Sequence, residues 1–248
     1  MSKIKIVVFD MAGTTVKDEN EVEKCFVEAA ERSELKYTRE EIISMMGWPK
    51  IKVFETLWTK MLNGKPKEVI GEKVEYSYML FREILEKHYM TEDVVPIEGT
   101  MELFQWLKSN DIKIVLTTGF YRKVTDIILQ RLGWNKGLNS NYANGTIIDA
   151  SITSDMVTNG RPAPDMIFRA MEMYNITNPK QVIKIGDTPS DLQSGKNAGC
   201  CLSLGVTYGT HTKEQLSEYP NDGLINNILE IKQLISKQNE TFSKCIYF

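Results

Sequence analysis

The sequence predicts an α/β protein in which helices cover both faces of a doubly wound, Rossmann-like parallel sheet. Three short, β-branched apolar segments, at residues 3–9, 112–116 and 182–185, are each followed by polar residues. Apolar runs of this kind indicate strands that are buried on both faces. Helical patterns lie between and after these segments, and an alternation of strands and helices is typical of a parallel sheet.

The first predicted strand, residues 3–9, begins with polar alternation, continues as a β-branched run and stops at Asp10. Ligands of doubly wound sheets bind beyond the carboxyl ends of the strands. Because Asp10, Thr118 and Asp187 each follow a predicted strand, we expect the functional site at this edge. Helical patterns complete the core at Thr100 to Lys108, Arg122 to Leu132, Asp165 to Tyr174 and Asp191 to Ala198.

The stretch between the first two strands breaks the alternation, because its pattern is helical throughout. Glu21 to Glu31 is periodic, and Thr38 with Glu41 forms a capping box ahead of an apolar run. Pro66 is expected in the first turn of a long helix that reaches Tyr89. These patterns predict a helical insertion that lies over the ligand edge of the sheet.

The expected domain limits follow from the same patterns. An α/β core domain comprises residues 1–16 and 97–236, and Pro96 marks the return of the chain to it. Residues 17–96 form the helical cap domain. Residues 237–248 are expected to be a weakly ordered C-terminal tail.

Composition and charge disfavour several classes of function. The 30 Lys and Arg residues against 33 Asp and Glu residues give a net charge of -3, which provides no basic field for nucleic acid. The longest apolar runs are far below the roughly 18 to 20 residues that cross a bilayer. Since the first residues also lack the apolar region of a signal peptide, we expect a cytoplasmic protein without a membrane or nucleic-acid partner.

Asp10 places a carboxylate at the end of the first strand, directly before the turn Gly13-Thr14-Thr15. We expect backbone amides of this turn to bind a phosphoryl group, as in other backbone anion sites. A turn or capping aspartate is the structural alternative, and this short segment by itself leaves both open.

Asp187 and Asp191 lie four residues apart after the third strand. A turn that enters a helix would bring both carboxylates to the edge that carries Asp10. Oxygen ligands in this number suit Mg²⁺, which prefers octahedral geometry and keeps several waters. The alternative is a helix N-cap with a neighbouring surface carboxylate.

Four segments, taken in order, resemble the four motifs of the haloacid dehalogenase (HAD) superfamily. They are Phe9-Asp10-Met11-Ala12-Gly13-Thr14-Thr15-Val16, Thr117-Thr118-Gly119, Gly160-Arg161-Pro162 and Gly186-Asp187-Thr188-Pro189-Ser190-Asp191. Within the superfamily, the Asp-x-Ala-Gly-Thr-Thr form and the insertion segment Met46-Gly47-Trp48-Pro49-Lys50 resemble the phosphonoacetaldehyde hydrolases, or phosphonatases. The resemblance covers the whole predicted core and implies a hydrolase that acts on a phosphorus bond.

The resemblance also implies catalytic roles. Asp10 attacks phosphorus to give an aspartyl-phosphate. Thr118 hydrogen-bonds the transferring phosphoryl group, and Arg161 offsets its charge. The further substrate contacts that the motifs imply are Ala12, Gly13, Thr14, Gly47 and Gly119.

The cofactor that the resemblance implies is Mg²⁺. Asp10 and Asp187 bind the ion directly, and the backbone carbonyl of Ala12 adds a ligand. Asp191 supports these ligands.

Ala12 distinguishes the chain from a general phosphatase. The superfamily's phosphomonoesterases carry a second aspartate at this position, which protonates the leaving alkoxide. A methyl group has no proton to give. The leaving group then needs no acid, another donor replaces it, or activity has been lost.

Lys50 is the candidate for an imine with a keto phosphonate, which would stabilise the departing carbon as an enamine. It follows Trp48 and Pro49 in an apolar setting that favours a lowered pKa of its ammonium group. Lysines are usually solvated, so a surface role is the structural alternative. Its place in the Met-Gly-x-x-Lys segment implies an imine-forming or substrate-contacting role.

Three positions depart from the phosphonatase pattern. Val53 stands where the family has a histidine, Phe120 where a tyrosine is common, and Asn20 where we expect a cysteine. The loss of the histidine removes the expected proton shuttle. These differences leave the exact substrate open.

The leading hypothesis is a Mg²⁺-dependent, phosphonatase-like hydrolase that acts on a small phosphonate. One alternative is a HAD phosphatase for a phosphate ester, acyl phosphate or anhydride that forms no imine. Another is a binding or regulatory protein that keeps the fold without activity. The apolar cap residues permit a homodimer through the cap.

Overall fold

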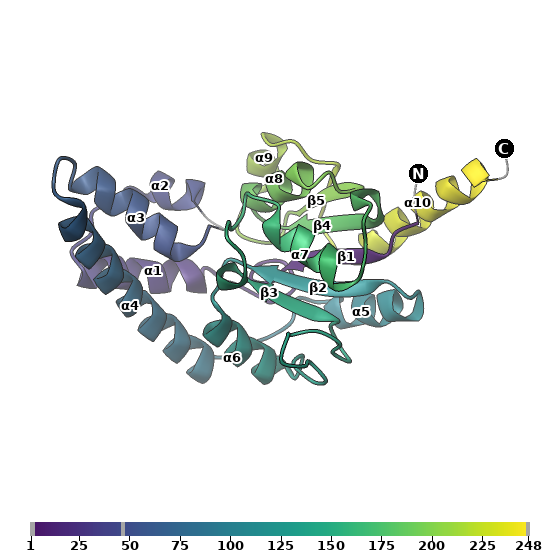
Figure 1. Ribbon diagram of the computed structural model, residues 1–248, viewed down its shortest axis with the longest axis horizontal. Coiled ribbons are helices and arrows are strands. Elements are labelled where there is room, and N and C mark those ends of the chain that lie inside the picture. The colour runs from purple at the N-terminus through teal and green to yellow at the C-terminus, as the bar shows by residue number, and fades with distance from the viewer. Residues whose placement is uncertain (1–2, 46–47, 247–248) are drawn as a thin grey trace.

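The computed structural model describes residues 3–45 and 48–246. In this part of the chain, a parallel sheet of six strands has the order β3-β2-β1-β4-β5-β6 (Figure 1). Its strands are β1 (Ile6–Asp10), β2 (Lys113–Thr118), β3 (Ala150–Thr153), β4 (Val182–Gly186), β5 (Leu202–Val206) and β6 (Gly223–Ile225). The predicted α/β class and doubly wound sheet are confirmed.

Strand β1 shows why its sequence is apolar along its whole length. Neighbouring side chains of a strand point to opposite faces of the sheet. Val7 and Phe9 pack into the apolar cluster that contains Leu103 of helix α5 (Thr100–Ser109). Ile6 and Val8 pack on the opposite side, in the cluster that contains Met166 of helix α7 (Asp165–Met173). Both faces of this central strand are therefore buried under helices.

The remaining core elements are helices and two short 3₁₀ turns. The helices are α5 (Thr100–Ser109), α6 (Arg122–Leu132), α7 (Asp165–Met173), α8 (Pro189–Asn197), α9 (Lys213–Ser217) and α10 (Glu230–Ile246). The 3₁₀ turns are η1 (Ser154–Met156) and η2 (Pro179–Gln181).

The helical cap follows the first strand and extends from one end of the core (Figure 1). It comprises α1 (Glu21–Arg32), α2 (Arg39–Ser44), α3 (Lys50–Met61) and α4 (Lys67–Thr91). The rings of Phe26 and Phe54 stack with their centroids 4.6 Å apart, and Phe81 meets both at an angle. The cap therefore has an aromatic core of its own.

The two chain segments that join the cap to the core lie side by side. The Lys17 amide donates to the Val95 carbonyl at 2.9 Å, and the Ile97 amide donates to the Thr15 carbonyl at 2.9 Å. These bonds bring the beginning and the end of the insertion together beside the turn that follows Asp10.

Helix α10 continues to Ile246, into the segment that the sequence analysis assigns to a C-terminal tail. Ile231 and Ile235 bury one side of this helix against the core. The Asn239 side chain accepts the backbone amide of Ile4 at 3.0 Å, which attaches the helix to the segment before β1. Packing of α10 on the core thus extends order beyond residue 237.

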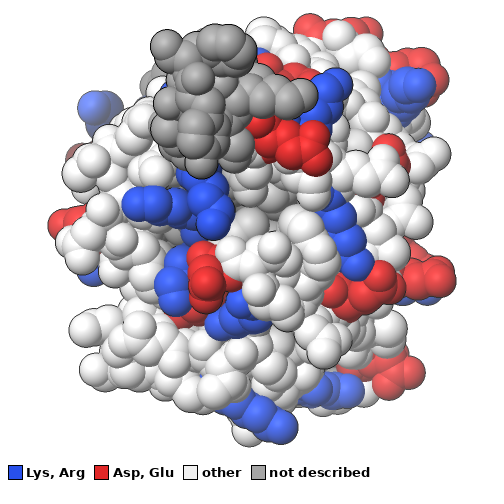
Figure 2. Space-filling view, turned by 90° about the vertical axis from the view of Figure 1, so that its right-hand side faces the viewer, with Lys and Arg blue, Asp and Glu red and all other residues white. Residues whose placement is uncertain are grey.

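In the described ranges, we find no helix that combines the length and apolarity needed to cross a membrane. On the face at the α10 end, side chains of both charge signs are interspersed (Figure 2).

Candidate active site

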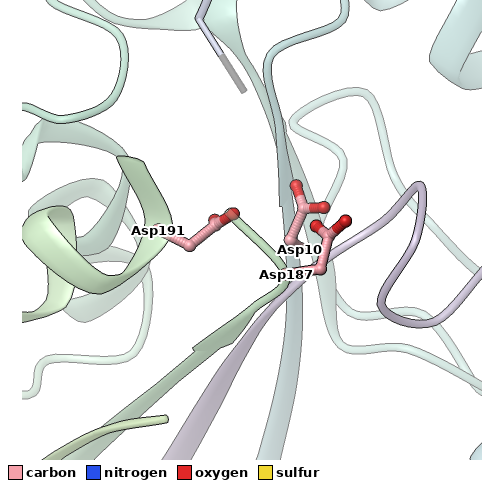
Figure 3. Close-up of side chains that lie close together, drawn as sticks. All are labelled: Asp10, Asp187 and Asp191. Atoms are coloured by element: carbon pink, nitrogen blue, oxygen red, sulfur yellow. The ribbon is translucent and has the colours of Figure 1, made fainter. Parts of the chain in front are cut away.

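Three buried carboxylates meet at the carboxyl edge of the sheet (Figure 3). Asp10 is the last residue of β1, Asp187 directly follows β4, and Asp191 lies in the first turn of α8. One oxygen of each lies within 4.8 Å of the others. Because β1 pairs with β4 in parallel, the ends of both strands deliver their acids to the same place. This arrangement is the one that the sequence predicts.

Arg161 connects two of these acids. Its Nη1 donates to Oδ1 of Asp10 at 2.6 Å and also to Oδ1 of Asp191. Its side chain is buried, so these contacts form away from water. Arg161 therefore lies where a cation can offset charge beside the predicted nucleophile.

Lys184 is a second buried cation that the sequence prediction missed. It lies in the middle of β4, and its Nζ is 2.7 Å from Oδ1 of Asp191. It also donates to the Ile185 carbonyl at 3.1 Å and to the Thr117 hydroxyl at 3.4 Å. A charged residue inside an apolar strand was the available signal, since a lysine is rarely buried without a partner.

Burial and neighbouring charges set the protonation of the acids. Burial raises the pKa of Asp191, but Arg161 and Lys184 outweigh it and hold this pKa below its ordinary value. Burial raises the pKa of Asp10 to about 7, although Arg161 opposes the shift. The pKa of Asp187 is raised by burial and by the charge of Asp191. A divalent cation would favour the ionised forms of these acids.

The backbone amides of the turn after Asp10 donate to carbonyl groups of the same turn. The Gly13 amide donates to the Val16 carbonyl at 2.8 Å, and the Thr14 amide donates to the Met11 carbonyl at 3.1 Å. The expectation that these two amides bind a phosphoryl group is therefore corrected, because they hold the turn itself.

Gly13 allows the close approach of Asp187 to this turn. Its φ of +81° lies in the left-handed region, and a Cβ at this position would overlap the Asp187 carboxylate. The Thr14 hydroxyl is 3.4 Å from Oδ1 of Asp187, and the Thr210 amide donates to Oδ2 at 2.7 Å. Gly13 and Thr14 thus position an acid of the site.

The donor set fits a magnesium ion. Both oxygens of Asp191 are engaged, Oδ1 by Arg161 and Lys184 and Oδ2 by the Thr188 hydroxyl at 2.6 Å. Among the described residues, Asp10 and Asp187 carry fewer contacts with cations. Their oxygens are the hard ligands that Mg²⁺ prefers, so these two fit direct coordination and Asp191 fits a supporting role.

A cavity of about 40 Å³ lies beside the acids. Of the predicted site residues, those that line it are Asp10, Ala12, Lys50, Thr118, Gly119, Arg161 and Asp187. The Thr118 hydroxyl accepts the Phe120 amide at 3.1 Å and keeps its own proton available for donation. Gly47 lies outside the described residues. Asp18, Trp48 and Thr210 also line the cavity and were not predicted.

Lys50 enters this cavity from the cap. It is the first residue of α3, and only 8% of it is exposed. Burial lowers its pKa to about 8, and the charge of Arg161 acts in the same direction, while Asp18 and Glu23 oppose it. The positive end of the α3 helix dipole further disfavours an ammonium group here. Lys50 is therefore far closer to a neutral amine at physiological pH than a surface lysine.

The departures from the phosphonatase pattern have different environments. Val53 lies one turn after Lys50 and is buried in the apolar core of the cap. Phe120 lines the cavity beside the acids, whereas Asn20 caps α1 in a left-handed conformation. Of these three departures from the family pattern, only the one at Phe120 lies at the wall of the cavity.

Comparison with known proteins identifies the family of this chain. The model of the haloacid dehalogenase-like hydrolase family matches residues 4–199. A phosphonoacetaldehyde hydrolase of Bacteroides fragilis is 30% identical over 244 residues, covering 94% of this chain and 89% of that protein. A phosphonoacetaldehyde hydrolase of Bacillus cytotoxicus is 33% identical over 216 residues, covering 84% of this chain and 77% of that protein.

Solved structures share the fold. A phosphonoacetaldehyde hydrolase-like protein from Oleispira antarctica has a TM-score of 0.79 and 18% identity, covering 98% of this chain and 95% of that one. A predicted phosphoglycolate phosphatase from Haemophilus somnus has a TM-score of 0.70 and 15% identity, covering 94% of this chain and 99% of that one. With the family model matching most of its length, the chain belongs to the haloacid dehalogenase-like hydrolases, in a phosphonatase-like form.

Proposed function

We propose that the protein cleaves the carbon-phosphorus bond of phosphonoacetaldehyde or a related keto phosphonate. The observation that carries this proposal is that Lys50 of the cap and Asp10 of the core line one cavity, both buried. An imine-forming amine and a carboxylate nucleophile are the two groups that the reaction needs. The names of the curated relatives support the same substrate class.

In the first step, the neutral Lys50 amine adds to the substrate carbonyl, and loss of water leaves a protonated imine. Asp10 then attacks phosphorus, so that a P–O bond forms and the C–P bond breaks. The electron pair of the broken bond moves into the protonated imine and gives an enamine. Protonation and hydrolysis of the enamine release the aldehyde and free Lys50, and water releases phosphate from Asp10.

Ala12 is compatible with this sequence of steps. It lines the cavity two residues after Asp10, where a phosphomonoesterase needs an acid for its alkoxide leaving group. The imine accepts the electron pair of the broken bond, so no proton is required on the leaving atom at that moment. A methyl group at residue 12 is then sufficient.

Other core residues support phosphoryl transfer. Arg161 already contacts Asp10 and would offset the charge of the phosphoryl group, and the Thr118 hydroxyl would donate to it. Asp10, Asp187 and the Ala12 carbonyl would hold Mg²⁺, with Asp191 in support. When bound, this ion would supply further stabilisation of the negative charge on the transferring oxygens.

Borohydride reduction tests the imine directly. With phosphonoacetaldehyde present, we expect irreversible inactivation and a reduced adduct on Lys50 in peptide mass spectrometry. Lys50→Arg, which keeps a positive charge but forms no imine, should give neither adduct nor C–P cleavage. Absence of an adduct in the native enzyme, together with brisk turnover of simple phosphate monoesters, would refute the proposal.

The alternative is a HAD phosphatase that acts on a small phosphate ester, acyl phosphate or anhydride without an imine. Val53 favours it, because the buried valine provides no proton transfer near Lys50. A phosphate-release screen that includes phosphonates, esters and acyl phosphates separates the two functions. A phosphatase would retain its turnover in Lys50→Arg.

A cytoplasmic location and a homodimer through the cap stay predictions. Exposed apolar side chains on α3 and α4, including Ile51, Met61 and Met79, support a second copy as the cap partner. Light scattering of the native protein and of Met79→Lys measures this directly. A native monomer would exclude the dimer.

A further inference from the structure

The proposed reaction needs a proton donor that the family pattern does not supply in this chain. Loss of water during imine formation and the later protonation of the enamine carbon each consume one proton. Ala12 has no acid, and Val53 replaces the expected histidine. Another group at the cavity must take this role if the proposed function holds.

The residues that line the cavity include one candidate for this proton donor. Among the described residues, the titratable side chains that line it are Asp10, Asp18, Lys50, Arg161 and Asp187. Asp10 is the nucleophile, Lys50 forms the imine, and Asp187 fits the cation. Arg161 stays protonated and is bonded to two carboxylates. Asp18 is the acid without another task in the reaction.

We propose that Asp18, together with Glu21, is the proton relay for the imine chemistry of Lys50. Asp18 lies in the segment that leads from the core into α1, so it reaches the cavity from the same side as the cap. This inference rests on the proposed function, because it assigns the protons of that reaction.

The environment of Asp18 keeps a proton on it. Burial, together with a side-chain hydrogen bond with Glu21, raises its pKa to about 8, although the Glu21 amide, which donates to Oδ1 at 2.7 Å, opposes the shift. The charged groups that face it are Glu21 on α1, Lys50 on α3 and Asp187 after β4. A protonated carboxyl group beside Lys50 has the right form to act as the acid.

Glu21 connects this acid to solvent. It is partly exposed, and its hydrogen bond with Asp18 lowers its pKa although its partial burial opposes this. The raised pKa of Asp18 and the lowered pKa of Glu21 together favour Asp18 as the member of the pair that carries the proton. A proton from water can reach Asp18 through Glu21 after each transfer.

The proton balance of the relay is complete. Asp18 gives its proton to the hydroxyl of the carbinolamine, water leaves, and the positive charge stays on the imine nitrogen. Glu21 passes a proton from solvent to the Asp18 carboxylate. After C–P cleavage, Asp18 protonates the enamine carbon and regains a proton from solvent through Glu21.

The variant Asp18→Asn tests the relay, because an asparagine oxygen still accepts the Glu21 amide but the side chain cannot supply an acidic proton. We expect kcat for phosphonoacetaldehyde to fall about 100-fold or more, with slower borohydride trapping at Lys50. Glu19→Gln, one residue away and exposed, is the matched control and should keep native turnover. Glu21→Gln keeps the hydrogen bond but cannot ionise, so a loss of about 10-fold is expected.

A second measurement does not depend on activity. With Mg²⁺ present at pH 7, the infrared difference between native protein and Asp18→Asn should contain the band of a protonated carboxyl group. Its absence, or turnover of Asp18→Asn within threefold of native, overturns the relay and leaves the proposed function standing. A native enzyme that neither cleaves phosphonoacetaldehyde nor traps an imine overturns the proposed function and the relay with it.

Discussion

The site has a core half, which contains Asp10, Asp191 and Lys184, and a cap half, which contains Lys50. The two buried lysines of these halves differ in their surroundings. Lys184 of the core is 1% exposed and contacts Asp191, a backbone carbonyl and a hydroxyl. Lys50 of the cap is also buried, but burial and the charge of Arg161 lower its pKa to about 8. The core therefore holds its lysine through opposite charge, whereas burial in the cap disfavours the ammonium form of Lys50.

This difference indicates a division of labour between the two halves. Opposite charges hold the core half together, since Asp10 and Asp191 share Arg161 and Asp191 also binds Lys184. In the cap half, burial is the main cause of the lowered pKa of Lys50. Changes in the core should therefore remove both chemistry and stability, while changes in the cap should alter reactivity and leave the fold intact.

The largest expected effect belongs to Asp10, the proposed nucleophile of the core. Asp10→Asn keeps the shape of the side chain but cannot form a P–O bond, so phosphate release should fall by roughly 10⁴-fold or more. A phosphate-release assay measures this loss. Asp126→Asn, the same substitution at a partly exposed aspartate outside the site, is the control. An Asp10→Asn enzyme within 10-fold of native would contradict the assignment of the nucleophile.

The second prediction concerns the fixed lysine of the core. Lys184→Met removes a cation from a buried carboxylate, and breaking such a pair costs roughly 3 to 5 kcal/mol. Urea unfolding should show this loss in the free energy of unfolding. If Lys184→Met were as stable as the native protein, the contrast between the two lysines would be wrong.

Sequence patterns predicted the core half well for a physical reason. Strands that pair in parallel end at the same edge, so acids after β1 and β4 must meet there. The short strands β3, β5 and β6 were missed, because their strand conformation depends on pairing with neighbours more than on their own residues. Their absence from the prediction did not alter the site.

The cap half was less predictable. Lys50 was identified through its segment, but Asp18 reaches the cavity only through the path of the chain between β1 and α1. No local pattern signals that path. Lys184 did carry a signal, a charge within an apolar strand, although its partner Asp191 becomes visible only in the fold.

The third prediction concerns Lys50, the buried lysine of the cap. Its folded-state pKa of about 8 lies below the ordinary lysine value of 10.5, so the unfolded chain binds more protons between these values. Below pH 8, burial of this amine therefore destabilises the fold by about 3 kcal/mol. Lys50→Met should unfold at higher urea than native protein at pH 7, opposite in sign to Lys184→Met.

The pH dependence of the free energy of unfolding tests this prediction. Native stability should rise relative to Lys50→Met between pH 8 and 10.5, and the difference between the two proteins should close over that interval. A difference that does not change with pH would mean that the methionine acts through packing alone.

The smallest expected effect lies at the contact that joins the two halves. A Cβ at Gly160 would be 2.5 Å from Cγ of Pro49, and these residues directly precede Arg161 and Lys50. The Gly160 loop is held firmly, since the Asn159 amide donates to an Asp165 oxygen at 3.0 Å. In Gly160→Ala, Pro49 must therefore move, and α3 with it.

Displacement of an amine by about 1 Å costs up to roughly 100-fold in rate, so Gly160→Ala should lower kcat for the phosphonate by about 10-fold to 100-fold. Pro49→Ala removes the ring atoms that the new methyl group meets, and the double variant should recover to the level of Pro49→Ala. Gly71→Ala, where a Cβ meets open space, controls for the substitution itself. If Pro49→Ala fails to rescue Gly160→Ala, the two halves are aligned by other contacts, because a steric clash is relieved whenever either partner is made smaller.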